Sequence, residues 1–293
     1  MNTPVVTRRA ALKTLAATTA LGLVARAQTP PPTYKIKHGR IRQSVVPWCF
    51  NPMPVPELAR HAAAVGLQSV ELCDPKFWPE LKQLGLTCAI SGSHGFSKGF
   101  AHTEEHDECL AILRKRIAEC AAAGVERVIT FSGFRRGLSD DVAMRNMVDG
   151  LKKIVGFAEE KKVTLCLEML NSRVATNMKG HPDYFCDDME RSVEVCRRIG
   201  SERMKVLFDI YHVQIMHGDV ITRLKQHLPY IAHVHTAGVP GRNEIDDTQE
   251  INYPPIMRTL IDLGYQGYVG QEFIPTGADK IAALAQGVKI CDV

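Results

Sequence analysis

Residues 163–172 read VTLCLEMLNS. The apolar side chains of Val163, Leu165 and Leu167, together with Cys166, form a short run that predicts a buried strand. This strand ends at the carboxylate of Glu168. An ionised carboxylate inside a protein costs several kcal/mol unless another group pairs with it. The position of Glu168 therefore predicts a partner elsewhere in the chain.

Runs of this kind occur eight times, and amphipathic segments separate them. We predict strands at residues 41–49, 69–73, 87–91, 127–131, 163–168, 205–209, 231–236 and 268–273. We predict helices at residues 56–65, 79–84, 104–123, 140–161, 187–199, 219–227, 254–263 and 278–291. Five of these helices are followed directly by glycine, the residue expected at C′: Gly66, Gly85, Gly124, Gly200 and Gly264.

Eight strand–helix units predict an α/β fold, a single (β/α)8 TIM barrel with a closed parallel sheet. The alternative is an open doubly wound sheet, which carries a GxGxxG fingerprint after one of its strands. The sequence has no such fingerprint. In the barrel, the carboxyl ends of the strands and the loops that follow them form the active-site face.

The first 27 residues are typical of an export signal. A twin-arginine pattern, TRRAALK at residues 7–13, precedes an apolar run at residues 15–24 and the small-residue site Ala25-Arg26-Ala27. The apolar run is shorter than the roughly 20 residues that a membrane span needs. We predict a cleaved twin-arginine signal at 1–27, a linker at 28–40, the barrel domain at 41–293 and a periplasmic location. An amphipathic N-terminal helix is the alternative.

Charge and cysteine content narrow the range of partners. The chain has 36 Lys and Arg against 32 Asp and Glu, and the signal holds four of the basic residues and no acid, so the remainder is neutral. A neutral chain without a basic, aromatic-rich run argues against a nucleic-acid groove. We expect a small-molecule partner and no stable membrane span, and leave a homo-oligomer open. The nine cysteines form no CxxC pair, which predicts mostly buried thiols.

The last four predicted strands each end on a group that can bind a metal. These groups are Glu168, Asp209, His235 and Glu272. Because the four strands are consecutive, their ends are neighbours at one mouth of the barrel. Three carboxylates and one imidazole suit a divalent cation such as Mn²⁺, Mg²⁺ or Co²⁺ better than a thiolate-bound zinc. The alternative for any single acid is a helix N-cap or a surface position.

Several motifs make the chain similar to a known family. They are Glu168-x-x-Asn171, FDIYH at 208–212 followed by Gln214, His233-Val234-His235, VPGRNE at 239–244, EINYP at 250–254 and GYQGYVGQE at 264–272. With these motifs the chain resembles the hydroxypyruvate isomerase family within the xylose isomerase-like barrels of sugar isomerases and epimerases. The resemblance implies metal ligands at the same four residues and catalytic glutamates at Glu168 and Glu272.

The chain departs from the subfamily patterns at two positions. His235 stands where hydroxypyruvate isomerases usually carry Gln, as it does in many ketose epimerases. Val174 stands where ketose 3-epimerases commonly place another substrate-binding Glu. The sequence therefore lies between subfamilies.

The resemblance implies proton transfer at a carbon next to a carbonyl. One divalent cation (Mn²⁺, Mg²⁺ or Co²⁺) stabilises a cis-enediolate of a sugar or hydroxy-keto acid while two glutamates move the proton. We predict aldose–ketose isomerisation. The alternatives are ketose 3-epimerisation, a 3-keto-sugar lyase or hydratase, a phosphodiesterase acting on damaged DNA, and a sugar-binding protein without catalysis.

Four further residues are candidates for substrate binding. The resemblance makes His212 a donor to a substrate oxygen, with helix capping as the alternative. Arg242 could hold a hydroxyl or carboxylate, or be a solvated loop residue. Trp48, at the end of the first predicted strand, could cover the apolar face of a sugar or belong to the core. His94, after the third predicted strand, is a further candidate.

Overall fold

The computed structural model describes Met1 and residues 34–293. Apart from Met1, the predicted export signal lies outside the described residues, as does the first part of the predicted linker. The rest of that linker is anchored to the end of the chain by Asp292. Its carboxylate accepts hydrogen bonds from the Tyr34 hydroxyl at 2.7 Å and from the Gly39 backbone N–H at 2.9 Å.

The sheet is parallel throughout and has the strand order β2-β1-β7-β6-β5-β4-β3. The strands are β1 (Arg42–Val45), β2 (Ser69–Val70), β3 (Arg127–Thr130), β4 (Thr164–Glu168), β5 (Met204–Asp209), β6 (Ile231–Thr236) and β7 (Tyr268–Gln271). Residues 87–91 join the two edges of this sheet through parallel bridges from Thr87 to Ser69 and from Ser91 to Val128. The predicted α/β TIM barrel is confirmed.

The predicted strand at 87–91 does not form a regular ladder. The backbone N–H of Ala89 donates instead to the buried Ser69 hydroxyl, at 2.7 Å. A backbone N–H that donates to a side chain is not available to pair with the neighbouring strand. This explains why only isolated bridges remain.

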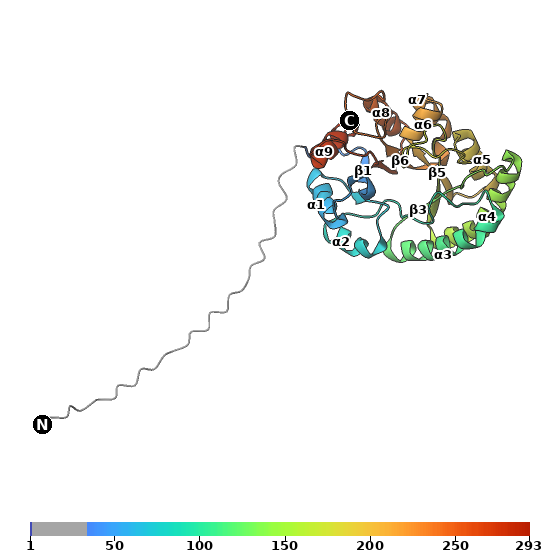
Figure 1. The fold of residues 1–293 in the computed structure, drawn as a ribbon, viewed down its shortest axis with the longest axis horizontal. Helices are drawn as coiled ribbons and strands as arrows, with labels where there is room; N and C mark the ends of the chain where they lie inside the picture. Colours follow the sequence, from blue (N-terminus) through green and yellow to red (C-terminus); the bar gives the residue numbers. More distant parts are fainter. Residues whose placement is uncertain (2–33) are drawn as a thin grey trace. The chain divides into compact units, whose positions relative to one another are not determined.

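Helices surround the strands (Figure 1). They are α1 (Val55–Val65), α2 (Trp78–Gln83), α3 (His106–Ala123), α4 (Asp140–Lys161), α5 (Met189–Ile199), α6 (Ile210–Met216), α7 (Val220–His227), α8 (Tyr253–Asp262) and α9 (Lys280–Cys291). The 3₁₀ helices are η1 (Pro47–Phe50), η2 (Pro75–Phe77), η3 (Thr103–Glu105) and η4 (Leu228–Tyr230). All five predicted C′ glycines have positive φ.

Two further elements differ from prediction. The first strand ends at Val45, because Pro47 cannot donate to a ladder and begins η1, so Trp48 lies in that 3₁₀ helix. The short helix α6 follows β5 directly, where the sequence predicts a loop. Asp209 caps α6, since its Oδ1 accepts the Tyr211 backbone N–H at 2.8 Å.

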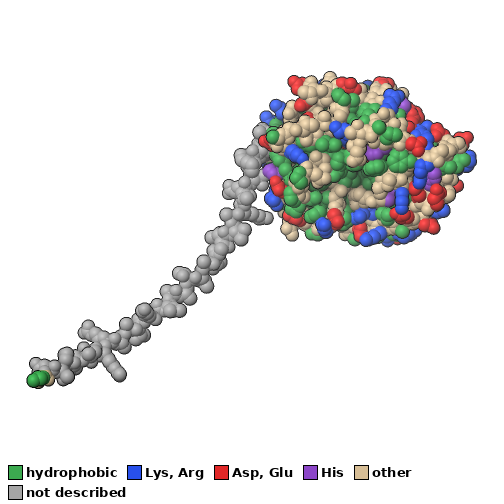
Figure 2. Space-filling model, in the orientation of Figure 1, with side chains coloured by type: hydrophobic (Ala, Val, Ile, Leu, Met, Phe, Trp, Pro, Cys, Tyr) green, Lys and Arg blue, Asp and Glu red, His purple; other side chains and the backbone are tan. Residues whose placement is uncertain are grey.

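The nine cysteines are buried and unpaired, as expected. No helix within residues 34–293 is long and apolar enough to cross a membrane. On the face seen in Figure 2, acidic and basic side chains alternate around the rim and hydrophobic side chains gather nearer the centre. This face shows no continuous basic patch.

Candidate metal and substrate site

The four predicted ligands meet at the mouth of the barrel. Glu168 ends β4, Asp209 ends β5, His235 lies near the end of β6 and Glu272 directly follows β7. Each offers one ligand atom, and these atoms all lie within 4.8 Å of one another. All four side chains are buried. We call these four residues the ligand cluster.

Two atoms of the ligand cluster have no partner in hydrogen-bond geometry. They are Oε1 of Glu168 and Nδ1 of His235, which lie 3.6 Å apart, although Nδ1 also lies 2.7 Å from Glu272 Oε2. A buried polar atom without a partner costs about 1–3 kcal/mol, so such atoms need an explanation. A bound cation supplies one, since it would pair with both atoms. Three carboxylates and one imidazole form a donor set that fits Mn²⁺, Mg²⁺ or Co²⁺.

The charges of the cluster are strongly coupled. Burial raises the pKa of Asp209 to about 7, against the opposing effect of Arg242. Burial also raises the pKa of Glu168. For Glu272 the same burial is outweighed by Arg242 and His235, which hold its pKa below the ordinary value. Without a cation, bound protons and the Arg242 guanidinium compensate the negative charge of the three carboxylates.

His235 carries one of these protons. Burial alone would lower its pKa, but the charge of Glu272 and the close approach of the Glu168, Glu272 and Glu71 carboxylates raise it well above the ordinary value. Its Nδ1 lies 2.7 Å from Glu272 Oε2. A cation has to displace this proton, because only the neutral imidazole is a metal ligand.

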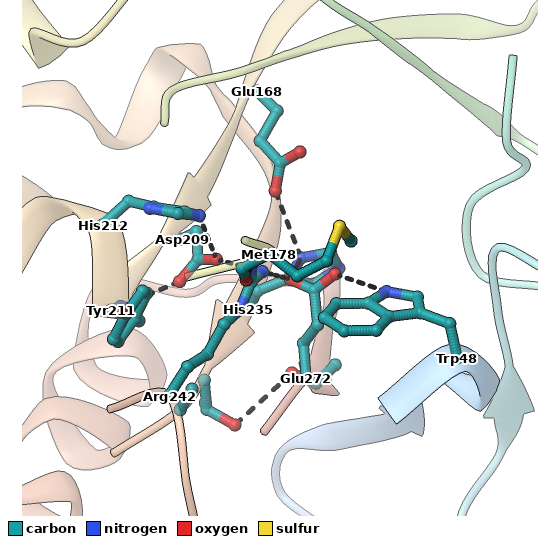
Figure 3. A network of polar contacts seen from close by, with 12 residues as sticks. Trp48, Glu168, Met178, Asp209, Tyr211, His212, His235, Arg242 and Glu272 are labelled. Carbon is teal, nitrogen blue, oxygen red and sulfur yellow. Dashed lines mark hydrogen bonds and ion pairs between the residues drawn. The ribbon is translucent and has the colours of Figure 1, made fainter. Parts of the chain in front are cut away.

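Arg242 belongs to the site and is not a solvated loop residue. Its side chain is 3% exposed. Nη2 donates to Glu272 Oε2 at 2.7 Å and lies 3.3 Å from Asp209 Oδ2, and Nη1 donates to the Met178 carbonyl at 2.7 Å (Figure 3). Nε is buried and has no partner. The guanidinium therefore spans two ligands and leaves its Nε–H without a partner.

His212 lies in α6 and presents one N–H to the site. Its Nδ1 accepts the Asn171 backbone N–H at 3.0 Å, so the neutral ring carries its proton on Nε2. Burial, reinforced by Arg242, lowers the pKa of His212 well below its ordinary value, which keeps the ring neutral. Nε2 lies 3.5 Å from Asp209 Oδ2 and has no hydrogen-bond partner. His212 is thus a free donor, not a helix cap.

A cavity of about 190 Å³ lies beside the ligand cluster, and Trp48 and His94 both line it. Trp48 Nε1 donates to Glu272 Oε1 at 3.2 Å. The His94 ring is fixed by two hydrogen bonds, from Nε2 to Thr130 Oγ1 at 3.0 Å and from Nδ1 to the Lys98 carbonyl at 3.3 Å. The structure therefore brings all of the predicted site residues together, in the ligand cluster or beside it. His94 forms part of the cavity wall and has no contact with the ligand cluster.

Glu71 is a site residue that is not among the predicted ones. It follows β2, is fully buried, and its Oε1 lies 2.7 Å from His235 Nε2 and 2.9 Å from His233 Nε2. Burial would raise the pKa of Glu71, but the two histidines hold it below its ordinary value. An ionised carboxylate only accepts hydrogen bonds, so both rings donate Nε2–H to it. This leaves Nδ1 of His235 directed at the ligand cluster, the arrangement by which carboxylates orient metal-binding histidines.

A sequence pattern could have identified Glu71 as a site residue, but no sequence pattern identifies His181. An acid in a predicted apolar strand is the feature that drew attention to Glu168, and Glu71 shows the same feature in the middle of the predicted strand 69–73. His181 comes from the long segment after β4 and packs against Phe96 in a tilted arrangement, with ring centroids 4.2 Å apart. Its position in the cavity wall depends on that loop's path, which no local pattern encodes.

Comparison with known proteins agrees with this geometry. Residues 59–290 match the model of the xylose isomerase-like TIM barrel family. The chain is 27% identical to the putative hydroxypyruvate isomerase of Homo sapiens, over 82% of this chain and 81% of that protein. It is 33% identical to the 2-oxo-tetronate isomerase of Cupriavidus necator, over 52% and 56% of the two chains. A crystal structure described as AP endonuclease, family 2, from Brucella melitensis superposes with a TM-score of 0.73 at 27% identity, covering 84% of this chain and 98% of that one.

Proposed function

The chain belongs to the xylose isomerase-like TIM barrel family, and from that premise we propose that it is a metal-dependent isomerase that interconverts an aldose and a ketose. Its substrate is a sugar or a hydroxy-keto acid, in keeping with relatives that are named as isomerases. The observation that carries the proposal is the ligand cluster, with four ligand atoms within 4.8 Å and two of them on glutamates.

Each residue of the site has a role in this reaction. The ligand cluster would hold one divalent cation, which supplies Lewis-acid stabilisation of negative charge on the substrate oxygens. In this proposal Glu168 and Glu272 remove a proton from one carbon and return it to its neighbour. His212 Nε2–H and the free Nε–H of Arg242 are donors for substrate oxygens. Trp48 covers one wall of the cavity.

Ketose epimerisation is the second candidate, because His235 stands where many ketose epimerases carry histidine. The two reactions differ only in the carbon or face that receives the proton. Proton NMR of the metal-loaded protein in D2O with a panel of sugars and hydroxy-keto acids separates them. Deuterium next to the carbonyl with a new aldose or ketose supports isomerisation, and an epimer supports the second candidate.

Two other results would contradict both candidates. Binding without deuterium incorporation would indicate a sugar-binding protein. Cleavage of DNA that contains abasic sites would indicate a nuclease, the activity for which the similar structure from Brucella melitensis is named. The neutral charge of residues 28–293 speaks against the nuclease.

We also propose export to the periplasm by the twin-arginine route. The support is the Arg8-Arg9 pair and the small-residue site at 25–27. Replacing both arginines by lysine should leave the precursor in the cytoplasm of a twin-arginine-competent host. Undiminished export of that variant would contradict the route.

A further inference from the structure

The cavity beside the ligand cluster has one charged wall and one apolar wall. The charged wall contains Glu168, Glu272 and Arg242. The apolar wall is built from side chains of η1 and of the segments that follow β2, β3 and β4: Trp48, Leu72, Phe96, Phe131, Leu170 and Met178. Figure 3 shows Trp48 and Met178 beside the charged groups, where the Trp48 indole meets Glu272 and the Met178 carbonyl meets Arg242. A substrate that reaches the ligand cluster therefore lies against aromatic and aliphatic side chains.

Arg242 is the one cationic side chain among the described residues that line this cavity. Two of its nitrogens already donate to the ligand cluster and to the Met178 carbonyl. The two lining histidines add no charge near neutral pH. Burial lowers the pKa of His181 to about 4, and it lowers that of His94 as well.

The loaded site has no positive charge left over for a substrate. Three ionised carboxylates of the ligand cluster, with the ionised Glu71 behind His235, face one divalent cation and the Arg242 guanidinium. A substrate carboxylate would enter this cavity as an extra negative charge without a counter-charge, and burying an unpaired charge is costly. A sugar of the same length brings no charge, and its C–H faces can pack on Trp48 and Phe96.

We propose that this site selects neutral hydroxy-ketones and their aldoses over the hydroxy-keto acids of the same carbon skeleton. This inference rests on the proposed isomerase function and departs from the acids in the names of the similar isomerases. The free donors of the site, His212 Nε2–H and Arg242 Nε–H, suit hydroxyl and carbonyl oxygens. The described lining offers no further fixed positive charge.

Two matched substrate pairs test the proposal. Dihydroxyacetone and hydroxypyruvate differ only in a CH2OH or carboxylate group, and so do erythrulose and 2-oxo-tetronate. Deuterium incorporation from D2O gives kcat/KM for each member with the metal-loaded protein. We expect the neutral member of each pair to be favoured at least about tenfold. Equal values, or a preference for the acids, would overturn the selectivity and leave the isomerase function standing.

A binding measurement covers the case in which neither pair exchanges. That outcome contradicts the isomerase function, while saturation-transfer NMR with erythritol and erythronate still reports on the cavity. Tighter binding of erythritol supports selection by charge. Equal or tighter binding of erythronate overturns it.

A charge introduced in the apolar wall should reverse the preference. Leu72→Lys places a cation beside the charged wall, and Leu72→Met is the matched control of similar length without charge. Relative to Leu72→Met, the lysine variant should raise the acid-to-neutral ratio of kcat/KM at least about tenfold. An unchanged ratio would mean that charge balance does not set the selectivity.

Discussion

The two halves of the barrel differ in regularity and in chemistry. Strands β4 to β7 are four to six residues long and pair in ladders with a single register shift, between Val206 and Leu207, and the whole ligand cluster lies on them or directly after them. In the half from β1 to β3, β2 has two residues and residues 87–91 form only bridges. This half supplies most of the apolar wall, including Trp48, Leu72 and Phe131. Regular backbone thus holds the charged groups in place, and irregular backbone shapes the cavity that covers them.

The largest effect is expected from the glutamates of the regular half. Glu272→Gln and Glu168→Gln keep the side-chain size but remove the group that carries the proton. General acid–base catalysis is typically worth about 10²–10⁴-fold, so deuterium incorporation into the substrate should fall by at least that order. The measurement is proton NMR in D2O on metal-loaded protein.

A control separates this loss from damage to the fold or to the metal site. Metal content has to be measured on the same samples, because both glutamates are also ligands. Glu105→Gln is the matched control, since Glu105 is a buried carboxylate that pairs with Arg136 at 2.5 Å outside the cavity. It should lower stability and leave exchange unchanged. If metal-loaded Glu272→Gln incorporates deuterium at the wild-type rate, Glu272 does not carry the proton. His212 is then the next candidate.

Glu71 links the two halves and should show the next largest effect. It follows β2 in the irregular half and fixes the ring of His235 in the regular half. Loss of an outer-shell partner typically weakens metal binding about 10–100-fold, and we expect this for Glu71→Gln. Calorimetry with Mn²⁺ gives the dissociation constant, and ¹⁵N NMR of the histidine rings reports the tautomer. Unchanged affinity with an unchanged tautomer would show that Glu71 is only a core residue.

Metal binding should depend on pH in a defined direction. Without metal, the raised pKa of His235 keeps it protonated near neutrality, and Asp209, with a pKa of about 7, is partly protonated at pH 7. Both protons have to leave when a cation binds, so affinity should rise with pH through this range and fall below it. We expect release of about one proton or more at pH 7. Calorimetry in buffers of different ionisation enthalpy counts the protons, and a count of zero would refute the charge assignment.

The smallest effect on the site is expected from the irregular half itself. Ser69→Ala removes the hydroxyl that accepts the Ala89 N–H. A buried donor left without a partner costs about 1–3 kcal/mol, which should appear as a lower free energy of unfolding in urea. Metal affinity should stay at the wild-type value. A large loss of affinity would mean that the two halves are more tightly coupled than the structure indicates.

The regular half is also the half that can be predicted from sequence. Its strands are near-continuous apolar runs that end on acids or histidine, so the ligand cluster follows from local pattern and the parallel arrangement of strands. The contact of Glu71 with His235 cannot be predicted in this way, because it joins residues 164 positions apart across the barrel. The burial of Arg242 depends likewise on tertiary approach to Glu272. Helix α6 has only seven residues, too few to show a helical period, so its segment resembles a loop.

The central claim is that the ligand cluster binds one divalent cation, and its most direct test is metal analysis of wild type and Asp209→Asn. Asparagine keeps an oxygen that can cap α6, so this variant removes the charge of the ligand without removing the cap. Elemental analysis after loading with Mn²⁺, with anomalous diffraction to locate the ion, should find one ion per wild-type chain among the four ligands. The variant should hold much less. No ion in the wild type, or full occupancy in Asp209→Asn, would contradict the account.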